Sequence, residues 1–386
     1  MNAIAKTTAE TALGLTLPHR RMEDWRWTDL RQLIDRPYPP RIAVEATKKD
    51  IETLMKASPF AKVAKARLVF VNGEFDKTRS KMAGLEVSDA IPSVNGDEPV
   101  LAMNVAFASG GVILKIAGTA DSPIELLHIA TDATPRTIAI RNRIEVAPGA
   151  SATILETHLG VGDYLSNSVM CIDIGEGARL DRVKVEVEST QAVHLAHAQV
   201  TLEAMAILRD FTFTTGARLN RQNGTYTFAG ENADARISGS YLLNGRQHAD
   251  TRLVVDHAVP HCTSRELFKC VLDENARGIF QGKVIVRPGA QKTDGKQSSH
   301  ALLLSETAEF DAKPELEIFA DDVVCGHGAT AGDLDHDHLF YLRSRGIPEA
   351  QARALLVAAF VEESFDAIEN EDVKAALTKM VEERLG

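Results

Sequence analysis

The chain has 386 residues, a mass of 41.9 kDa and a formal net charge of −11. With 44% hydrophobic and 25% charged residues, it has the composition of a folded protein of two or three domains, which argues against global disorder. The acidic balance argues against a nucleic-acid partner, because affinity for a phosphate backbone comes mainly from cations.

Membrane insertion and a cysteine framework are not indicated either. The longest apolar run, at 355–361, is far shorter than the roughly 20 residues of a spanning helix. Residues 1–20 carry polar and acidic side chains where a signal peptide has its apolar stretch. Four cysteines without a CxxC pair indicate neither a disulfide scaffold nor a structural zinc site. We therefore expect a cytoplasmic protein without a membrane partner.

Three regions differ in texture. Residues 1–100 mix helical and strand signals: 23–30 holds both tryptophans, and 68–71 predicts a strand that ends at an Asn-Gly turn. Residues 101–320 contain short β-like runs in close succession and predict the core of the protein. One example is 183–188, where valines alternate with Lys184, Glu186 and Glu188, the period of a half-buried strand.

A weak internal repeat runs through this core. Ala150, Ala178, Ala204 and Ala233 each precede a strand-like run, at spacings of 28, 26 and 29 residues, and Ala290 follows 57 residues later. A period of this length with several strands in each turn favours a β-solenoid. A β-sandwich is the alternative, since strands at short spacings fit it too.

The third region, residues 321–386, predicts a C-terminal helical domain. Asp335 can begin one helix, Gly346 can end it, Pro348 can open the next and Asn370 can cap a third. The region contains 14 acidic and 6 basic residues, which indicates either a solvated surface or a dock for a basic partner. The second helix is apolar on all sides at 354–361, so we expect it to be covered on two sides.

Motifs for nucleotide and acyl chemistry are absent. The sequence has no GxxxxGK[ST], no GxGxxG between a strand and a helix, and no GxSxG. These absences argue against an intrinsic ATPase, a dinucleotide dehydrogenase and a standard serine hydrolase.

Three clusters contain residue types that bind metals. His257, His261 and Cys262 lie close in sequence, but Pro260 disfavours the helix that would align the histidines, and polar turn residues are the alternative reading. The run 333–338 is rich in aspartate and histidine, which helix capping also explains.

Cys325-Gly326-His327 is the sharpest candidate, because it lies where the strand-rich region meets the helices. Thiolate and imidazole suit iron, zinc and copper. Two ligands do not hold an iron–sulfur cluster, which usually takes four, so the others must come from elsewhere. A buried cysteine without function is the alternative.

Several ordered segments resemble the SufB/SufD family of iron–sulfur cluster assembly proteins. The detailed similarity covers about 265–365, and the tetrapeptide 327–330 resembles the SufD branch. Gly326 departs from that branch, where we expect a small hydroxyl residue. The segments that carry the resemblance are 23–30, 278–283, 290–294, 302–305, 313–318, 322–330 and 339–347.

The resemblance implies a mainly β protein with a right-handed parallel β-helix core and helical N- and C-terminal regions. It implies a non-enzymatic scaffold that pairs with a SufB paralogue and docks the ABC-type ATPase SufC. A nascent iron–sulfur cluster would form at the shared interface, with His327 as a metal ligand and Cys325 beside it. The SufC contact would involve Phe340, Tyr341, Arg343 and Arg345.

The same resemblance implies no cofactor bound tightly by the chain alone. It leaves open a homodimer of the isolated chain and a visit by reduced flavin to the complex. Two other classes stay as alternatives. One is a β-helix enzyme acting on acidic polysaccharide, and the other is a stand-alone metalloprotein that uses His257, His261 and Cys262.

Overall fold

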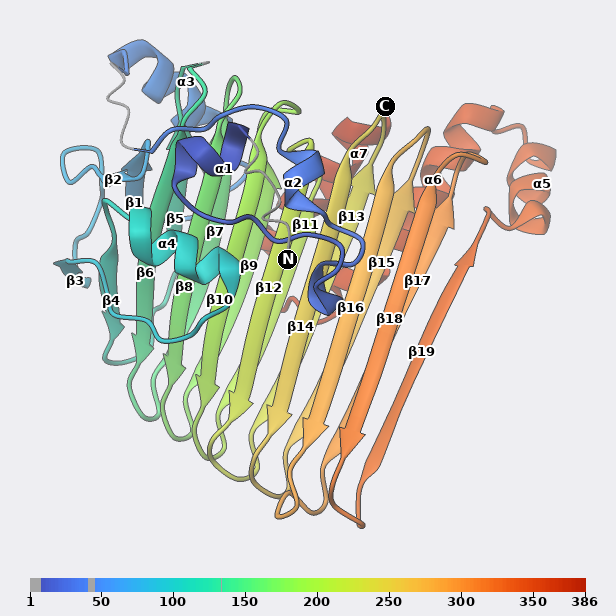
Figure 1. The fold of residues 1–386 in the computed structure, drawn as a ribbon. Helices are drawn as coiled ribbons and strands as arrows, with labels where there is room; N and C mark the ends of the chain where they lie inside the picture. Colours follow the sequence, from blue (N-terminus) through green and yellow to red (C-terminus); the bar gives the residue numbers. More distant parts are fainter. Residues whose placement is uncertain (1–7, 41–45, 133) are drawn as a thin grey trace, which may run out of the picture.

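Two long β-sheets wind around a common interior in the computed structural model, which describes residues 8–40, 46–132 and 134–386 (Figure 1). Successive strands alternate between the sheets, so that strand neighbours within a sheet are usually two apart in the chain. These neighbours are parallel, and antiparallel pairs occur only at β1–β2 and β3–β4 among the described residues. This alternation confirms the predicted β-solenoid and is not that of a sandwich.

The first sheet has ten strands and the second has nine. The strands of the first sheet are β1 (Ala66–Val71), β2 (Glu74–Phe75), β5 (Ile124–Ala130), β7 (Ser151–Gly160), β9 (Arg179–Val187), β11 (Ile207–Thr214), β13 (Asp234–Leu243), β15 (Thr263–Leu272), β17 (Asp294–Leu303) and β19 (Val324–Gly332). Those of the second are β3 (Glu86–Asp89), β4 (Val112–Ile116), β6 (Thr137–Val146), β8 (Leu165–Ile174), β10 (Val193–Leu202), β12 (Leu219–Phe228), β14 (His248–His257), β16 (Arg277–Val286) and β18 (Glu309–Ile318).

Equivalent residues of successive turns stack in register and form the core. One buried column of the second sheet runs through aliphatic and aromatic side chains, because each strand aligns with the one two places on. Its members are Ile144, Ile172, Val200, Tyr226, Val255 and Val284. Their spacings in the sequence are 28, 28, 26, 29 and 29 residues, so the predicted period is that of one solenoid turn.

One position of the predicted repeat is wrong. Arg179 pairs with Ile207, so the residue equivalent to Ala178 is Ala206 and not Ala204. Ala206 is fully buried at the corner, whereas Ala204 lies two residues earlier in the turn and is partly exposed. A short side chain is needed only where the chain turns into the interior.

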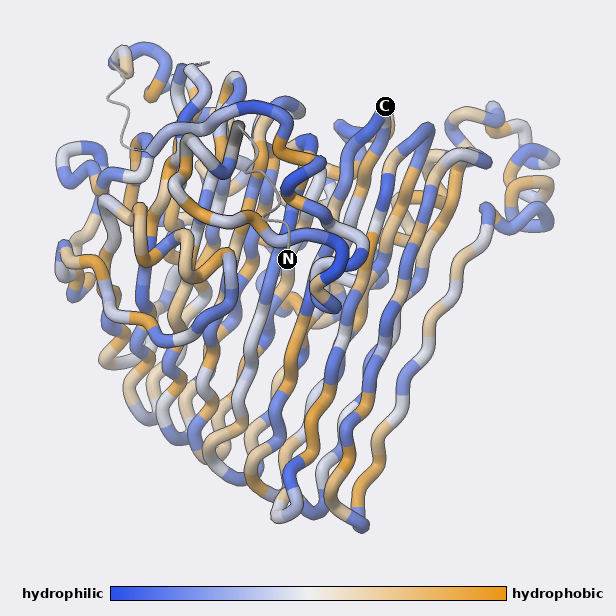
Figure 2. The backbone as a smooth tube through the Cα atoms, in the orientation of Figure 1, coloured by the Kyte–Doolittle hydropathy of each residue, from blue (hydrophilic) through white to orange (hydrophobic). Residues whose placement is uncertain are grey.

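The strand at 183–188 is buried on both faces, which corrects the half-buried prediction. Val183 and Val185 pack outward against the C-terminal helices. Lys184 and Glu186 point inward and contact His194 of the opposite sheet. Figure 2 shows hydrophobic and hydrophilic positions alternating along the strands, and the hydrophilic positions include this polar part of the interior.

Helices cover the outer faces of both sheets. In Figure 1, α4 lies across β6, β8 and β10, and α5 projects beyond β19. The helix α6 packs on the first sheet, with Val357 and Val361 in one buried cluster with Val183 and Phe211. The helical segments are α1 (Thr8–Leu13), η1 (Glu23–Trp25), α2 (Leu30–Leu33), α3 (Lys48–Ala57), α4 (Pro99–Phe107), α5 (His336–Ser344), α6 (Glu349–Glu362), η2 (Glu363–Phe365) and α7 (Glu371–Leu385).

The N-terminal segment is tied to the second sheet. Trp25 is 2% exposed and lies under the guanidinium of Arg221, 4.4 Å from the ring centroid. Thr28 Oγ1 lies 2.9 Å from His248 Nε2. The sheets themselves extend from Ala66 to Gly332, beyond the 101–320 range expected for the core. No helix of the described ranges is long and apolar enough to cross a membrane.

Candidate functional site

The last strand, β19, forms one edge of the first sheet. It pairs with β17 on one side, and within the described ranges no strand pairs with its other side. Six of its nine residues in a row, from His327 to Gly332, are exposed. An unpaired strand edge presents free backbone donors and acceptors to which another chain can bind.

Cys325 and His327 lie on this edge strand. They are two residues apart, so both side chains lie on the same face of the strand, about 7 Å apart along it. Cys325 is partly buried against the core, whereas His327 is exposed. Their partners on β17 are Gly295 and Gln297. The imidazole is therefore accessible to a second chain and is not sealed in the apolar interior.

The thiol next to the imidazole is not activated in the isolated chain. Burial raises the pKa of Cys325 above its usual value of 9.0. A thiol with a raised pKa stays protonated and binds metal only when the metal displaces the proton. Among the described residues, the groups of three or more metal-ligating side chains include neither Cys325 nor His327. This chain thus brings two of the four ligands that a cluster usually takes.

Gly326 separates these two residues. A Cβ atom added there would meet no atom within 4 Å. The small hydroxyl residue that the family resemblance leads us to expect would therefore fit, and packing does not require the glycine.

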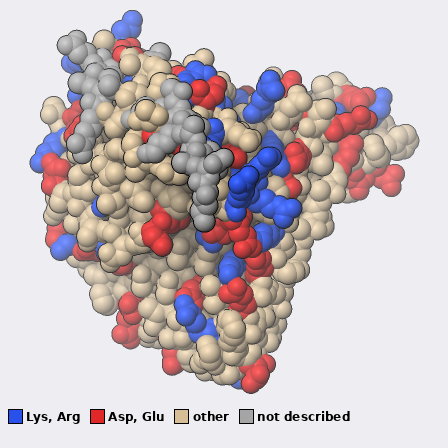
Figure 3. All heavy atoms as spheres, in the orientation of Figure 1, with Lys and Arg blue, Asp and Glu red and all other residues tan. Residues whose placement is uncertain are grey.

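The residues predicted to bind the ATPase lie on α5. Phe340 is 74% exposed and Tyr341 is 56% exposed, while Leu339 anchors the helix with 8% exposure. Arg345 lies over the Tyr341 ring, with the guanidinium 5.1 Å from the centroid, and Arg343 pairs with Glu349 of α6 at 3.3 Å. Apolar side chains this exposed, on an arm whose surface carries acidic and a few basic groups (Figure 3), are typical of an interaction surface.

The structure separates the residues of the His257, His261 and Cys262 candidate. His257 is fully buried and stacks on Phe228, with ring centroids 4.3 Å apart. His261 is exposed at a turn with φ of 63°, and the Cys262 thiol donates to the Gly230 carbonyl. None of the metal-ligating groups among the described residues contains these three side chains.

The aspartates of 333–338 serve the start of α5. The Asp335 carboxylate accepts hydrogen bonds from the amides of Asp337 and His338, at 2.8 and 3.0 Å. Asp333 accepts one from Leu334 at 2.6 Å. Helix capping explains this run, as the sequence suggested.

Comparison with known proteins matches residues 128–360 to the sequence model described as the SufBD core domain of the SUF system for iron–sulfur cluster assembly. The match spans more than half of the chain and includes Cys325, His327 and α5. The chain belongs to the SufBD family.

Full-length relatives agree with this SufBD assignment. The chain is 30% identical to the iron–sulfur cluster assembly protein SufD of Escherichia coli over 96% of its own length and 89% of that protein. It is 30% identical to a SufBD family protein of Synechocystis, over 95% of this chain and 87% of that one. A SufBD family protein of Mycobacterium tuberculosis is 34% identical over 63% of each chain. The chain is thus a SufD homologue, which favours cluster assembly over the polysaccharide-active alternative.

Sequence reasoning missed a second group of potential ligands in this SufBD protein. His128, Glu156, His158, Glu188 and His194 lie together inside the solenoid, each less than 9% exposed. The available signal was the one-turn spacing of His128 and His158, which align on neighbouring strands.

Proposed function

We propose that this chain is a non-enzymatic scaffold subunit for iron–sulfur cluster assembly. It pairs with a longer SufB paralogue through the open edge at β18 and β19, and the nascent cluster forms between the two chains. His327 supplies one metal ligand and Cys325 lies beside it. The partner supplies the remaining ligands, so the cluster is held transiently and belongs to the complex.

The exposed imidazole on an unpaired edge strand carries this proposal. A ligand that bound a metal within one chain would be surrounded by other ligands of that chain, and His327 is not. A partner strand that paired with β19 would pass close to Cys325 and His327, because paired strands lie roughly 5 Å apart. Edge pairing and ligand sharing are then consequences of one contact.

The arm formed by α5 and α6 docks a SufC-type ABC ATPase. Phe340 and Tyr341 provide the apolar part of the contact, and Arg343 and Arg345 provide cations around it. Since α6 is packed against the first sheet, a force applied to α5 is transmitted to the solenoid end that carries β19. ATP hydrolysis in the docked subunit thereby opens and closes the assembly interface.

The ligand role is tested on the reconstituted complex with the variant His327→Asn. The amide keeps the size and polarity of the exposed side chain but removes the imidazole. We expect complex formation to persist and the yield of cluster, measured as acid-labile sulfide, to fall by about tenfold or more, as for loss of a first ligand.

The matched control is His261→Asn, because His261 is also an exposed histidine and asparagine tolerates its positive φ. Cluster yield in this control should equal that of the wild type. If His327→Asn assembles clusters as the control does, the proposed ligand is wrong.

A further inference from the structure

Ligand-type side chains from both sheets gather in the solenoid interior, far along the chain from β19. His128 and His158 stack in parallel, with ring centroids 4.4 Å apart, on a column that begins with Phe70. Glu156 Oε1 lies 2.7 Å from His158 Nε2. One potential ligand atom from each of His128, Glu156 and His158 lies within 4.8 Å of the other two.

The His128 ring has an unused nitrogen. Its Nε2 is buried and finds no hydrogen-bond partner among the described residues. A buried polar atom without a partner costs about 1–3 kcal/mol, so an occupant that satisfies it would stabilise the fold. Burial lowers the pKa of both His128 and His158, so each neutral ring carries a free lone pair.

Space for an occupant exists beside the two rings. A cavity of about 20 Å³ is lined by His128, His158, Tyr164 and Glu188. A cavity of roughly 10–15 Å³ already holds one water molecule, so a single ion fits as well. Polar walls of this kind favour an ion or water over an empty void.

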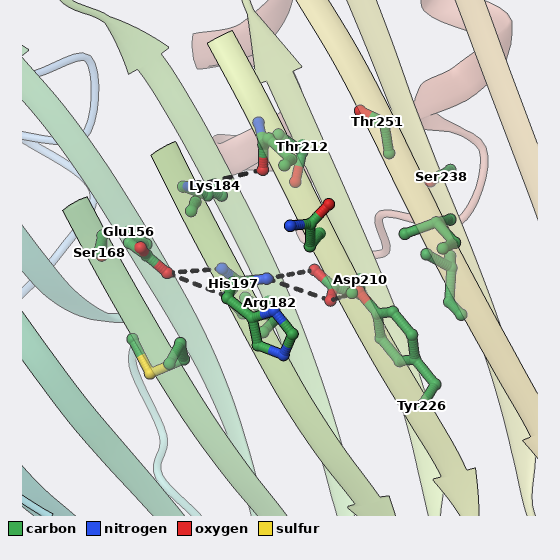
Figure 4. A pocket seen from close by; sticks show the side chains of 18 of the residues that line it. Glu156, Ser168, Arg182, Lys184, His197, Asp210, Thr212, Tyr226, Ser238 and Thr251 are labelled. Carbon is green, nitrogen blue, oxygen red and sulfur yellow. Dashed lines mark hydrogen bonds and ion pairs between the residues drawn. The ribbon is translucent and has the colours of Figure 1, made fainter. Parts of the chain in front are cut away.

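The surrounding charges favour a cation. Arg182 binds the other Glu156 oxygen, at 2.7 Å, and also Asp210 at 2.9 Å, as Figure 4 shows. This pair fixes the orientation of the Glu156 carboxylate, as outer groups do around metal ligands. The interior network contains four carboxylates and three cations, which leaves one negative charge unbalanced. The carboxylates are Glu156, Glu186, Glu188 and Asp210; the cations are Arg182, Lys184 and the protonated ring of His194.

We propose that His128, Glu156 and His158 form a buried site for one divalent first-row transition-metal ion. Two imidazoles and a carboxylate are the ligand types that such ions prefer. The ion takes the place of the proton between His158 and Glu156. Glu188 and His194 lie on the other side of His158 and contribute charge, and His194 Nδ1 is 2.7 Å from Glu188 Oε2. The site is separate from Cys325 and His327 and departs from the expectation that the chain alone holds no cofactor.

A stacked histidine with a purely structural role offers the matched comparison. His257 is buried and stacks on Phe228, much as His128 stacks on Phe70. The Nε2 atom of His257 lies 3.0 Å from the Ser264 hydroxyl, and no carboxylate or second histidine joins it in a ligand group within the described ranges. Replacing either ring by phenylalanine keeps the aromatic column.

The test is the Co²⁺ content of the full chain, expressed in medium supplemented with Co²⁺ and purified without chelators. We expect about one ion per chain in the wild type, with visible absorption bands typical of imidazole coordination. His128→Phe should stay folded, because it keeps the stack and removes the unpaired Nε2, and its metal content should fall at least about tenfold.

His257→Phe should retain the metal content of the wild type, and His327→Asn should retain it as well. The proposal is overturned if wild type and His128→Phe hold equal amounts of Co²⁺, or if His257→Phe loses the ion to the same extent. Because all these proteins are measured without a partner chain, failure here leaves the shared assembly site standing.

Discussion

At the scale of single residues, a strongly perturbed group outside both sites is Glu266 of β15. It is 2% exposed and points into the interior between Ile237 and Gln297 of the neighbouring strands. Burial raises its pKa to about 8, and the nearby Ser264 hydroxyl offsets only part of that effect. At neutral pH the carboxyl is therefore mostly protonated.

This raised pKa makes stability depend on pH. Between the ordinary value of 4.5 and about 8, the folded chain keeps a proton that the unfolded chain releases. The contribution of Glu266 to the free energy of unfolding therefore falls as pH rises through this window. We predict that Glu266→Gln is more stable than the wild type by about 2 kcal/mol at about pH 9, and that the difference shrinks towards about pH 5.

Urea unfolding midpoints at the two pH values measure this effect. Glu203→Gln is the control, because Glu203 is exposed and should show no such pH dependence. A stabilisation by Glu266→Gln that is the same at both pH values would mean that the carboxyl does not titrate in the native state as stated.

Residue patterns predicted the edge pair and missed the interior cluster for a physical reason. Cys325-Gly326-His327 is contiguous, so its chemistry is visible in the sequence. His128, His158 and His194 meet only because solenoid turns stack them, at separations of one turn or more. His257 and His261 look close in sequence, but the turn directs one ring inward and the other into solvent.

At the scale of elements, the strand alternation was sufficient to predict the solenoid but not the burial of each face. The 183–188 segment has the pattern of a surface strand, yet Lys184 and Glu186 are 2% and 0% exposed. Their charges are accommodated inside because His194 and each other's side chains pair with them. A pattern of alternation reveals two faces, and only the assembled fold shows that both are covered.

The exposed face of α5 leads to a further prediction. Phe340→Asp or Tyr341→Asp places a charge in the proposed apolar contact with the ATPase, where desolvation is costly. We expect co-purification of a SufC-type ATPase to fall about tenfold or more, while circular dichroism shows an unchanged β-core. Both side chains are exposed, so the fold does not depend on them.

Val161→Asp serves as the control for this prediction. Val161 is 48% exposed, comparable to Tyr341, but lies in the turn between β7 and β8. Its substitution should leave ATPase binding unchanged. Retained binding in the α5 variants would show that the ATPase docks elsewhere.

At the scale of the whole molecule, the chain is a solenoid whose two ends differ. The N-terminal end is closed by the antiparallel strands β2 and β3 and by α3 and α4, whereas β18 and β19 end the sheets without a covering strand in the described ranges. The one exposed ligand pair lies at the open end. This asymmetry is the structural basis for a scaffold that is complete only with a partner chain.

The most direct measurement of that claim compares acid-labile sulfide and iron on this chain alone, on a SufB paralogue alone and on their complex, after identical anaerobic reconstitution. The account predicts that this chain alone binds no sulfide-containing cluster. It also predicts that the complex gains a cluster whose spectrum changes when His327 is replaced by asparagine. A stoichiometric cluster on this chain alone, or a cluster on the complex that does not respond to His327→Asn, would contradict it.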